Sequence, residues 1–156
     1  MGKSVKGILL MTYGTPTNEE EIETYFQLMN HGNGQEKKTL QLWKERFQVI
    51  GDGKAIQQIT WDQAAELLDK LNELNPAVEY KTYLGYHSFS PTIEAAMEKM
   101  AEDGVTEAIS VVLSPLYSMM TVKDFNERAV QTAKKLGIQL TTVTNWYKEQ
   151  NLIWYW

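Results

Sequence analysis

Short apolar runs and longer amphipathic segments alternate along this chain. The first run, residues 7–11 (GILLM), ends at a turn that contains Gly14 and Pro16. A short apolar run closed by glycine or proline indicates a buried strand. The run at residues 108–113 (AISVVL) is rich in β-branched residues and predicts a central strand. We expect strands at residues 7–11, 78–84, 108–113 and 140–143.

The segments between these runs carry apolar residues at helical spacing. Asn18 precedes three glutamates, an arrangement typical of a helix N-terminus. Pro91 is expected at the first position of a later helix, and Gly137 at the C-cap of another. The pattern predicts helices over residues 19–31, 36–47, 60–74, 91–103 and 122–136.

Strands and helices therefore alternate four times, which predicts an α/β domain. Such domains have parallel strands, right-handed crossovers and helices on both faces of the sheet. Ligands bind outside the carboxyl ends of the strands. We therefore expect a site in the loops at residues 12–16, 86–90 and 114–121.

Composition narrows the class of protein. The length of 156 residues fits one domain, and 43% apolar and 22% charged residues are typical of a soluble globular protein. The net charge of −5 argues against nucleic-acid binding, which depends on clustered basic residues. The chain has no cysteine, which excludes disulfides and favours a cytoplasmic location. No apolar run has the length of a membrane span.

Three side chains are candidates for chemistry. Tyr13 places a phenol at the end of the first strand, where it either ligates iron or packs over the sheet. His87 lies in a strand-end loop and is either a proton acceptor or a hydrogen-bonded structural residue. His31, at a helix C-terminus, is better explained by the preference of the helix dipole for a cation. The chain has no phosphate-binding loop and no serine-hydrolase motif.

The end of the chain is unusually apolar. Residues 146–156 contain five aromatic side chains, whereas chain ends are usually polar and loosely held. An apolar end needs a surface to cover it. The tail therefore packs either on its own domain or against another domain or a second chain.

Ten short motifs follow one another in a fixed order. They are GILLMTYGTP at 7–16, RF at 46–47, IG at 50–51, QIT at 58–60, Gly85, Pro91, DGVTEA at 103–108, SPLYS at 114–118, NERA at 126–129 and WY at 146–147. No single motif is decisive, but their order and spacing together are specific. They resemble the N-terminal half of the ferrochelatases of Gram-positive bacteria, which insert iron into a porphyrin. The resemblance runs from Lys6 to the end of the chain.

The resemblance implies a chelatase-like three-layer sandwich, in which helices flank a four-stranded parallel sheet. The family has two such domains around a porphyrin cleft. Residues 1–156 would form the first, and the absent second domain would carry the family's metal-insertion histidine and glutamate. Tyr13 matches the tyrosine that faces the porphyrin metal, and Arg46 and Phe47 resemble an Arg–Tyr pair at the cleft. The resemblance implies no required cofactor; iron and porphyrin or haem are the expected substrates or ligands.

Other cleft positions depart from the family. Asn30 and His31 stand where relatives carry paired arginines, and neither side chain reproduces the bidentate fork of arginine. Lys54 lies in place of a Ser-Pro pair, Phe125 replaces a tyrosine, and Leu116 stands where histidine is frequent. The expected porphyrin contacts are Tyr13, Asn30, His31, Arg46, Phe47, Lys54 and Phe125, with Tyr13 as metal ligand and His87 as catalytic residue.

Two functions follow from these residues. In the first, the chain is a lyase of haem biosynthesis whose cleft is completed by a second domain or by a homodimer, through the aromatic tail. Tyr13 would face the metal, His87 would move a pyrrole proton, and Arg46 would hold a propionate. In the second, the chain is a non-catalytic porphyrin- or haem-binding protein, or a divergent truncated protein, of the same chelatase-like fold.

Overall fold

A computed structural model describes residues 4–29, 36–51 and 53–155 of the chain. Its four strands form one parallel sheet in the order β2–β1–β3–β4. The two inner strands carry the most apolar segments of the sequence, as expected for strands buried on both faces. The bounds are β1 (Ser4–Thr12), β2 (Val78–Tyr86), β3 (Glu107–Val112) and β4 (Gln139–Val143).

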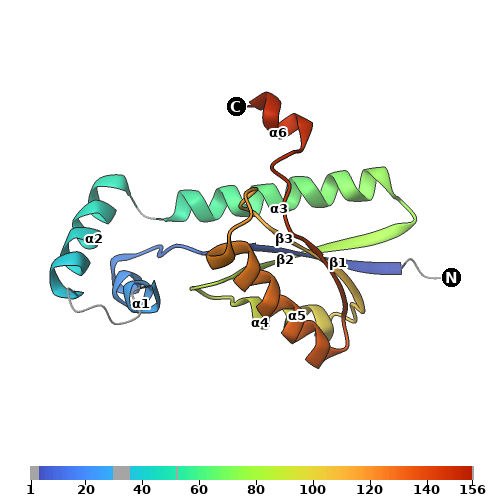
Figure 1. Ribbon diagram of the computed structural model, residues 1–156, viewed down its shortest axis with the longest axis horizontal. Helices are drawn as coiled ribbons and strands as arrows, with labels where there is room; N and C mark the ends of the chain where they lie inside the picture. Colours follow the sequence, from blue (N-terminus) through green and yellow to red (C-terminus); the bar gives the residue numbers. More distant parts are fainter. Residues whose placement is uncertain (1–3, 30–35, 52, 156) are drawn as a thin grey trace.

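Helices cover both faces of this sheet, as Figure 1 shows. One face packs against α3 (Lys54–Leu74), and the other packs against α4 (Ile93–Glu102) and α5 (Asp124–Leu136). Side chains alternate along β1, so that Leu9 and Met11 enter the α4–α5 core. Ile8 and Leu10 enter the α3 core. The predicted fold class, an α/β domain with a four-stranded parallel sheet flanked by helices, is confirmed.

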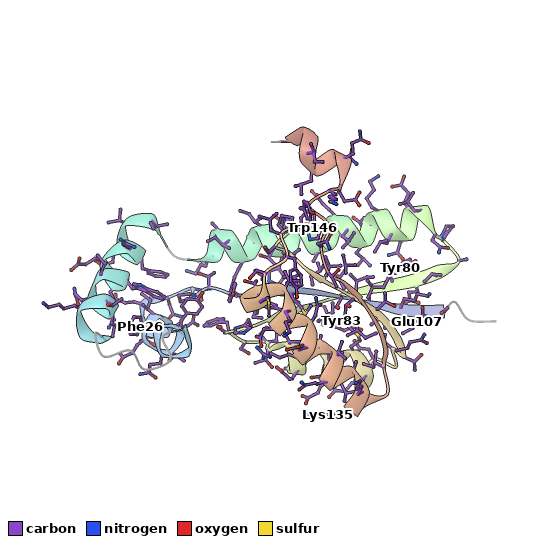
Figure 2. All side chains as sticks on the ribbon, viewed as in Figure 1. Phe26, Tyr80, Tyr83, Glu107, Lys135 and Trp146 are labelled. Atoms are coloured by element: carbon purple, nitrogen blue, oxygen red, sulfur yellow. The ribbon has the colours of Figure 1, made fainter. Side chains whose placement is uncertain are left out.

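Two helices lie outside these layers. Helices α1 (Glu19–Met29) and α2 (Glu36–Ile50) lie beyond the carboxyl end of β1 (Figure 1). They pack through Phe26 and Trp43, whose rings meet edge to face at 5.2 Å; Figure 2 labels Phe26. We call α1 and α2 the arm, and the sheet with α3, α4 and α5 the body.

Several predicted boundaries hold and several do not; α2, for example, ends at Ile50 and not at 47. Asn18 accepts a hydrogen bond from the backbone of Glu21 at 3.0 Å, and Gly137 caps α5 with φ of 70°, both as expected. Helix α3, however, begins six residues before the predicted start at Thr60, directly after Gly53. Pro91 precedes Thr92, the N-cap of α4, and so is not the first helical residue.

The segment before α5 also differs from the prediction. A π-helical turn, η1 (Met119–Lys123), leads directly into α5, where the sequence predicted a plain helix start at Val122. Its backbone closes from the N–H of Lys123 to the carbonyl of Ser118 at 3.1 Å. The chain therefore enters α5 through a wider turn than an ordinary helix start.

The aromatic tail packs in part on its own domain. The indole of Trp146 donates a hydrogen bond to the carbonyl of Val112 at 2.9 Å, and its backbone N–H bonds to Pro115. Beyond it, α6 (Gln150–Tyr155) lies above α3 in Figure 1, and Ile153 is 58% exposed. Among the residues described, no helix combines the length and the apolar character that a membrane crossing requires.

Candidate functional site

Tyr13 and His87 are the first residues after β1 and β2. Because these strands are parallel neighbours, their carboxyl ends open at the same edge of the sheet. The backbone pairing continues past the strands: His87 N–H bonds to Thr12 at 2.9 Å, and Ser88 N–H bonds to Tyr13 at 3.1 Å. Gly14 then turns with φ of 82°, where an added Cβ would lie 2.6 Å from Phe89. This turn keeps the Tyr13 and His87 loops together.

Three rings meet at this edge, and we call Tyr13, His87 and Phe125 the aromatic cluster. The Tyr13 ring lies 5.3 Å from His87 and 5.2 Å from Phe125, the latter edge to face. The His87 imidazole stacks on Phe125 with centroids 5.0 Å apart. Phe125, in the first turn of α5, is fully buried and lies beneath the other two rings of the cluster, on the core side. Such edge and stacked contacts stabilise a fixed ring geometry.

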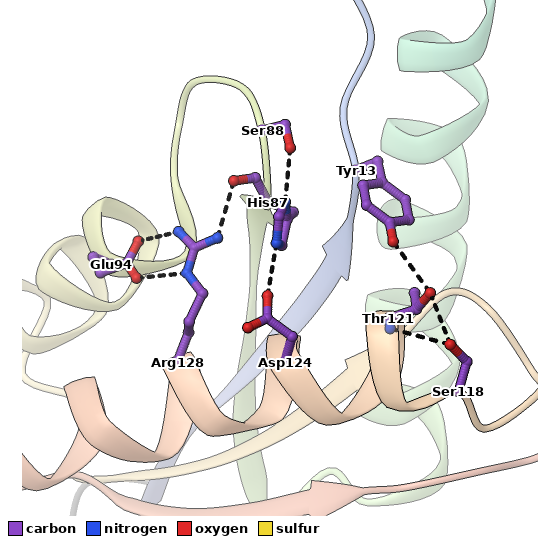
Figure 3. Close-up of polar contacts among 8 residues, drawn as sticks. All are labelled: Tyr13, His87, Ser88, Glu94, Ser118, Thr121, Asp124 and Arg128. Carbon is purple, nitrogen blue, oxygen red and sulfur yellow. Dashed lines mark hydrogen bonds and ion pairs between the residues drawn. The ribbon is translucent and has the colours of Figure 1, made fainter. Parts of the chain in front are cut away.

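Hydroxyl groups of η1 hold the phenol of Tyr13. Its oxygen lies 3.1 Å from the Oγ1 of Thr121 (Figure 3). Ser118 accepts a hydrogen bond from the backbone of Thr121 and donates to its hydroxyl at 3.2 Å. The cap of η1 therefore orients the phenol, the group that the sequence proposes as a metal ligand.

Both ring nitrogens of His87 are engaged. Nε2 lies 2.7 Å from the Oδ2 of Asp124, and Nδ1 lies 2.7 Å from the Oγ of Ser88 (Figure 3). The Asp124 side chain is 46% exposed and the His87 side chain 25%, whereas Ser88 is buried. One side of the imidazole thus meets a carboxylate near solvent, and the other meets a hydroxyl inside the protein.

An ion pair between α4 and α5 anchors the His87 loop. Arg128 donates to both carboxylate oxygens of Glu94, at 2.9 and 2.7 Å, and to the carbonyl of His87 at 2.9 Å. Hydrogen bonds from this guanidinium hold the pKa of Glu94 below its usual value. The same carboxylate raises the pKa of Arg128. A bidentate pair of this kind fixes geometry as well as charge.

A groove of about 480 Å³ opens beside the cluster, between the arm and the start of α3. The Tyr25 ring links the two, because it lies 6.0 Å from Trp43 in the groove and 6.4 Å from Phe89 in the His87 loop. An apolar groove with few polar groups suits a flat hydrophobic ligand, and a guanidinium at its wall suits a carboxylate. It is lined by Thr15, Pro16, Ile22, Tyr25, Trp43, Arg46, Phe47, Ile50, Gly51, Gly53, Ala55 and Ile56.

The candidates from the sequence thus fall into three groups. Tyr13, His87 and Phe125 lie together in the aromatic cluster. Arg46 and Phe47 line the groove, and the exposed Lys54 is the first residue of α3, between two residues that line it. Asn30 and His31 lie outside the described residues.

The sequence reasoning missed Asp124 and Arg128, which hold the ring and the backbone of His87. Their signal was a carboxylate and a guanidinium one helical turn apart, in the helix that follows the third strand end. Nowhere in the described ranges do three or more histidine, aspartate or glutamate side chains gather as a metal site.

Comparison with known proteins adds a family. Residues 5–156 match the ferrochelatase family. The chain is 44% identical over 156 residues to the coproporphyrin III ferrochelatase of Oceanobacillus iheyensis, and 40% identical over 157 residues to that of Bacillus subtilis. It is 44% identical over 150 residues to that of Staphylococcus aureus. These matches cover 96–100% of the chain and 49–51% of each relative, so the chain spans about half the length of its curated relatives.

Proposed function

We propose, because this chain belongs to the ferrochelatase family, that it supplies the N-terminal wall of an enzyme that inserts iron into coproporphyrin III. The observation that carries the proposal is the meeting of Tyr13, His87 and Phe125 at the strand ends, beside an apolar groove that contains Arg46. The relatives at 40–44% identity are named for this porphyrin.

The groove offers what a tetrapyrrole needs. Its aromatic and aliphatic side chains fit a flat macrocycle, and Arg46 offers a fork for one propionate. Tyr13 would face the metal with its phenol, held by Thr121. His87 would take a pyrrole proton as the metal enters. Iron and porphyrin are substrates in this scheme, and the opposite wall comes from a second domain or a second copy of the chain.

The test is a titration of the purified chain with iron coproporphyrin III and with the metal-free porphyrin. The Soret band reports binding, iron insertion is assayed in the same samples, and light scattering gives the mass of the complex. Tyr13→Phe is the matched variant, since it removes one oxygen and keeps the ring. We expect saturable binding, with a phenolate-to-iron absorption band that Tyr13→Phe abolishes. A well-folded chain that binds neither porphyrin would contradict the proposal.

A second function is binding of iron porphyrin without insertion. The observation that favours it is the engagement of both His87 nitrogens, which leaves no ring nitrogen without a partner to take a pyrrole proton. Binding without turnover, with or without a dimer, would support this alternative. Turnover by a complex of two chains would support the homodimer, with the tail around Trp146 and Ile153 as the candidate contact.

A further inference from the structure

We infer that Asp124 is a positioning residue of this site. Its carboxylate holds the His87 imidazole against Phe125 and beside Tyr13, and it fixes the ring hydrogen on Nε2, so that Nδ1 carries the lone pair of the neutral ring. This inference rests on the proposed function for its consequence in porphyrin binding. Its structural part stands on the contacts of His87 alone.

The hydrogen on Nε2 follows from the chemistry of its partner. A carboxylate only accepts hydrogen bonds, so at 2.7 Å from the Oδ2 of Asp124 the Nε2 atom of His87 must donate. In the neutral ring Nδ1 then has a lone pair, and the hydroxyl of Ser88 at 2.7 Å can donate to it. A carboxylate that orients an imidazole in this way selects one tautomer.

The position of the ring follows from its surroundings. Phe125 lies under one face at 5.0 Å, and Tyr13 lies at a tilt of 59° with centroids 5.3 Å apart. Arg128 holds the carbonyl of the same residue. With the backbone fixed at one end and Nε2 fixed at the other, the imidazole cannot turn without losing the Asp124 bond.

Other charged groups nearby have partners of their own. Arg128 is paired with Glu94, and Lys123 lies 3.7 Å from Glu127. Asp124 therefore directs its carboxylate to His87 from the first turn of α5 (Figure 3). Through the ring it also supports Tyr13, which packs against both His87 and Phe125.

Nitrogen-15 NMR of the ligand-free chain tests the structural part. The chain has two histidines, and a His31→Gln variant separates their signals. We expect neutral His87 to carry its hydrogen on Nε2, and Asp124→Ala to yield a mixture of tautomers. Glu127→Ala is the matched control, because it removes a carboxylate from the same first turn without touching His87. A hydrogen on Nδ1, or no change in Asp124→Ala, would overturn the inference.

A double-mutant cycle tests the consequence for binding. We expect Asp124→Ala to weaken iron coproporphyrin III binding about three- to tenfold, and to have almost no further effect in a His87→Ala background. Equal losses in both backgrounds would show that Asp124 does not act through His87. If Asp124→Ala does not fold, Asp124→Asn repeats both measurements with the side-chain shape retained. If Tyr13→Phe leaves binding unchanged, the proposed function fails while the NMR result still decides the tautomer.

Discussion

The body and the arm are built differently although both contribute to the same site. In the body, Leu9, Met11, Met97 and Phe125 are fully enclosed between the sheet and the α4–α5 layer. In the arm, Ile22 and Phe26 of α1 are buried, but none of the described α2 side chains, residues 38–50, is buried. Helix α2 therefore has little apolar burial to hold it, and most of its surface meets solvent.

This difference separates two tasks. The aromatic cluster is fixed by strand ends, the η1 cap and the Glu94–Arg128 pair, all of which belong to the body. The arm contributes Trp43, Arg46 and Phe47 to the groove. Regions with little burial open at a lower free energy than the core. Under the proposed function, the chemistry would fall to rigid elements, and recognition of the ligand's edge to a part that can adjust.

The largest expected effect contrasts two large-to-small substitutions. Met97→Ala in α4 removes a fully buried side chain and should lower the free energy of unfolding by about 2–5 kcal/mol. Leu42→Ala in α2, where the side chain is 44% exposed, should change it by less than about 0.5 kcal/mol. Urea unfolding followed by circular dichroism measures both. Similar losses at the two positions would break the distinction between body and arm.

The strands and most helices were predictable because the apolar positions in their sequences are the positions that are buried in the structure. Residues 7–11 form an apolar run and are buried on both faces of the sheet. The start of α3 was missed for the opposite reason. Ile56 and Ile59 in its first turns are 58% and 57% exposed, so the apolar residues there do not mark a face directed at the core. The pattern therefore gave no sign that the helix extends back to Lys54.

The sequence predicted which loops form the candidate site, but not the contacts that α5 makes with them. Tyr13 and His87 follow from the rule that ligands bind at strand ends, which holds for any parallel sheet. The Asp124–His87 contact joins a strand-end loop to the first residue of α5, which follows directly on the π-helical turn at 119–123. A turn with one extra residue has no clear periodic signature in a sequence. The contact therefore became visible only in three dimensions.

The next prediction concerns the ion pair that fixes the body around His87. Glu94→Gln should lower the free energy of unfolding at neutral pH by about 1–2 kcal/mol, because it weakens a bidentate pair. Larger values for buried pairs do not apply, since the two side chains are 39% and 26% exposed and solvent screens them. Glu98→Gln, on the exposed side of the same helix, is the control and should have almost no effect.

The pH dependence of this effect has a definite sign. Arg128 lowers the pKa of Glu94 in the folded chain, so the unfolded chain binds the proton more tightly. The contribution to stability is therefore complete above the ordinary value of 4.5 and is lost as the pH falls through the lowered pKa. Unfolding curves from pH 7 to pH 3 should show the gap between the wild type and Glu94→Gln closing at acid pH. A gap that widens there would contradict this assignment.

The smallest effect is expected in the arm and concerns ligand recognition. Arg46→Ala should weaken coproporphyrin III binding only about two- to fivefold, because its exposed guanidinium would meet a propionate in the presence of solvent. Lys44→Ala removes the same charge from the same helix at a position that does not line the groove, and should leave the affinity unchanged.

Salt and ligand chemistry separate the specific contact of Arg46 from a general charge effect. The loss in Arg46→Ala should shrink as ionic strength rises, because exposed charge pairs are screened. It should vanish for a porphyrin whose carboxylates are esterified, since no propionate then remains to pair with the fork. Equal losses for Arg46→Ala and Lys44→Ala would mean that the arm attracts the porphyrin only by its overall charge. A loss confined to Arg46 and to free carboxylates would assign ligand recognition to the arm.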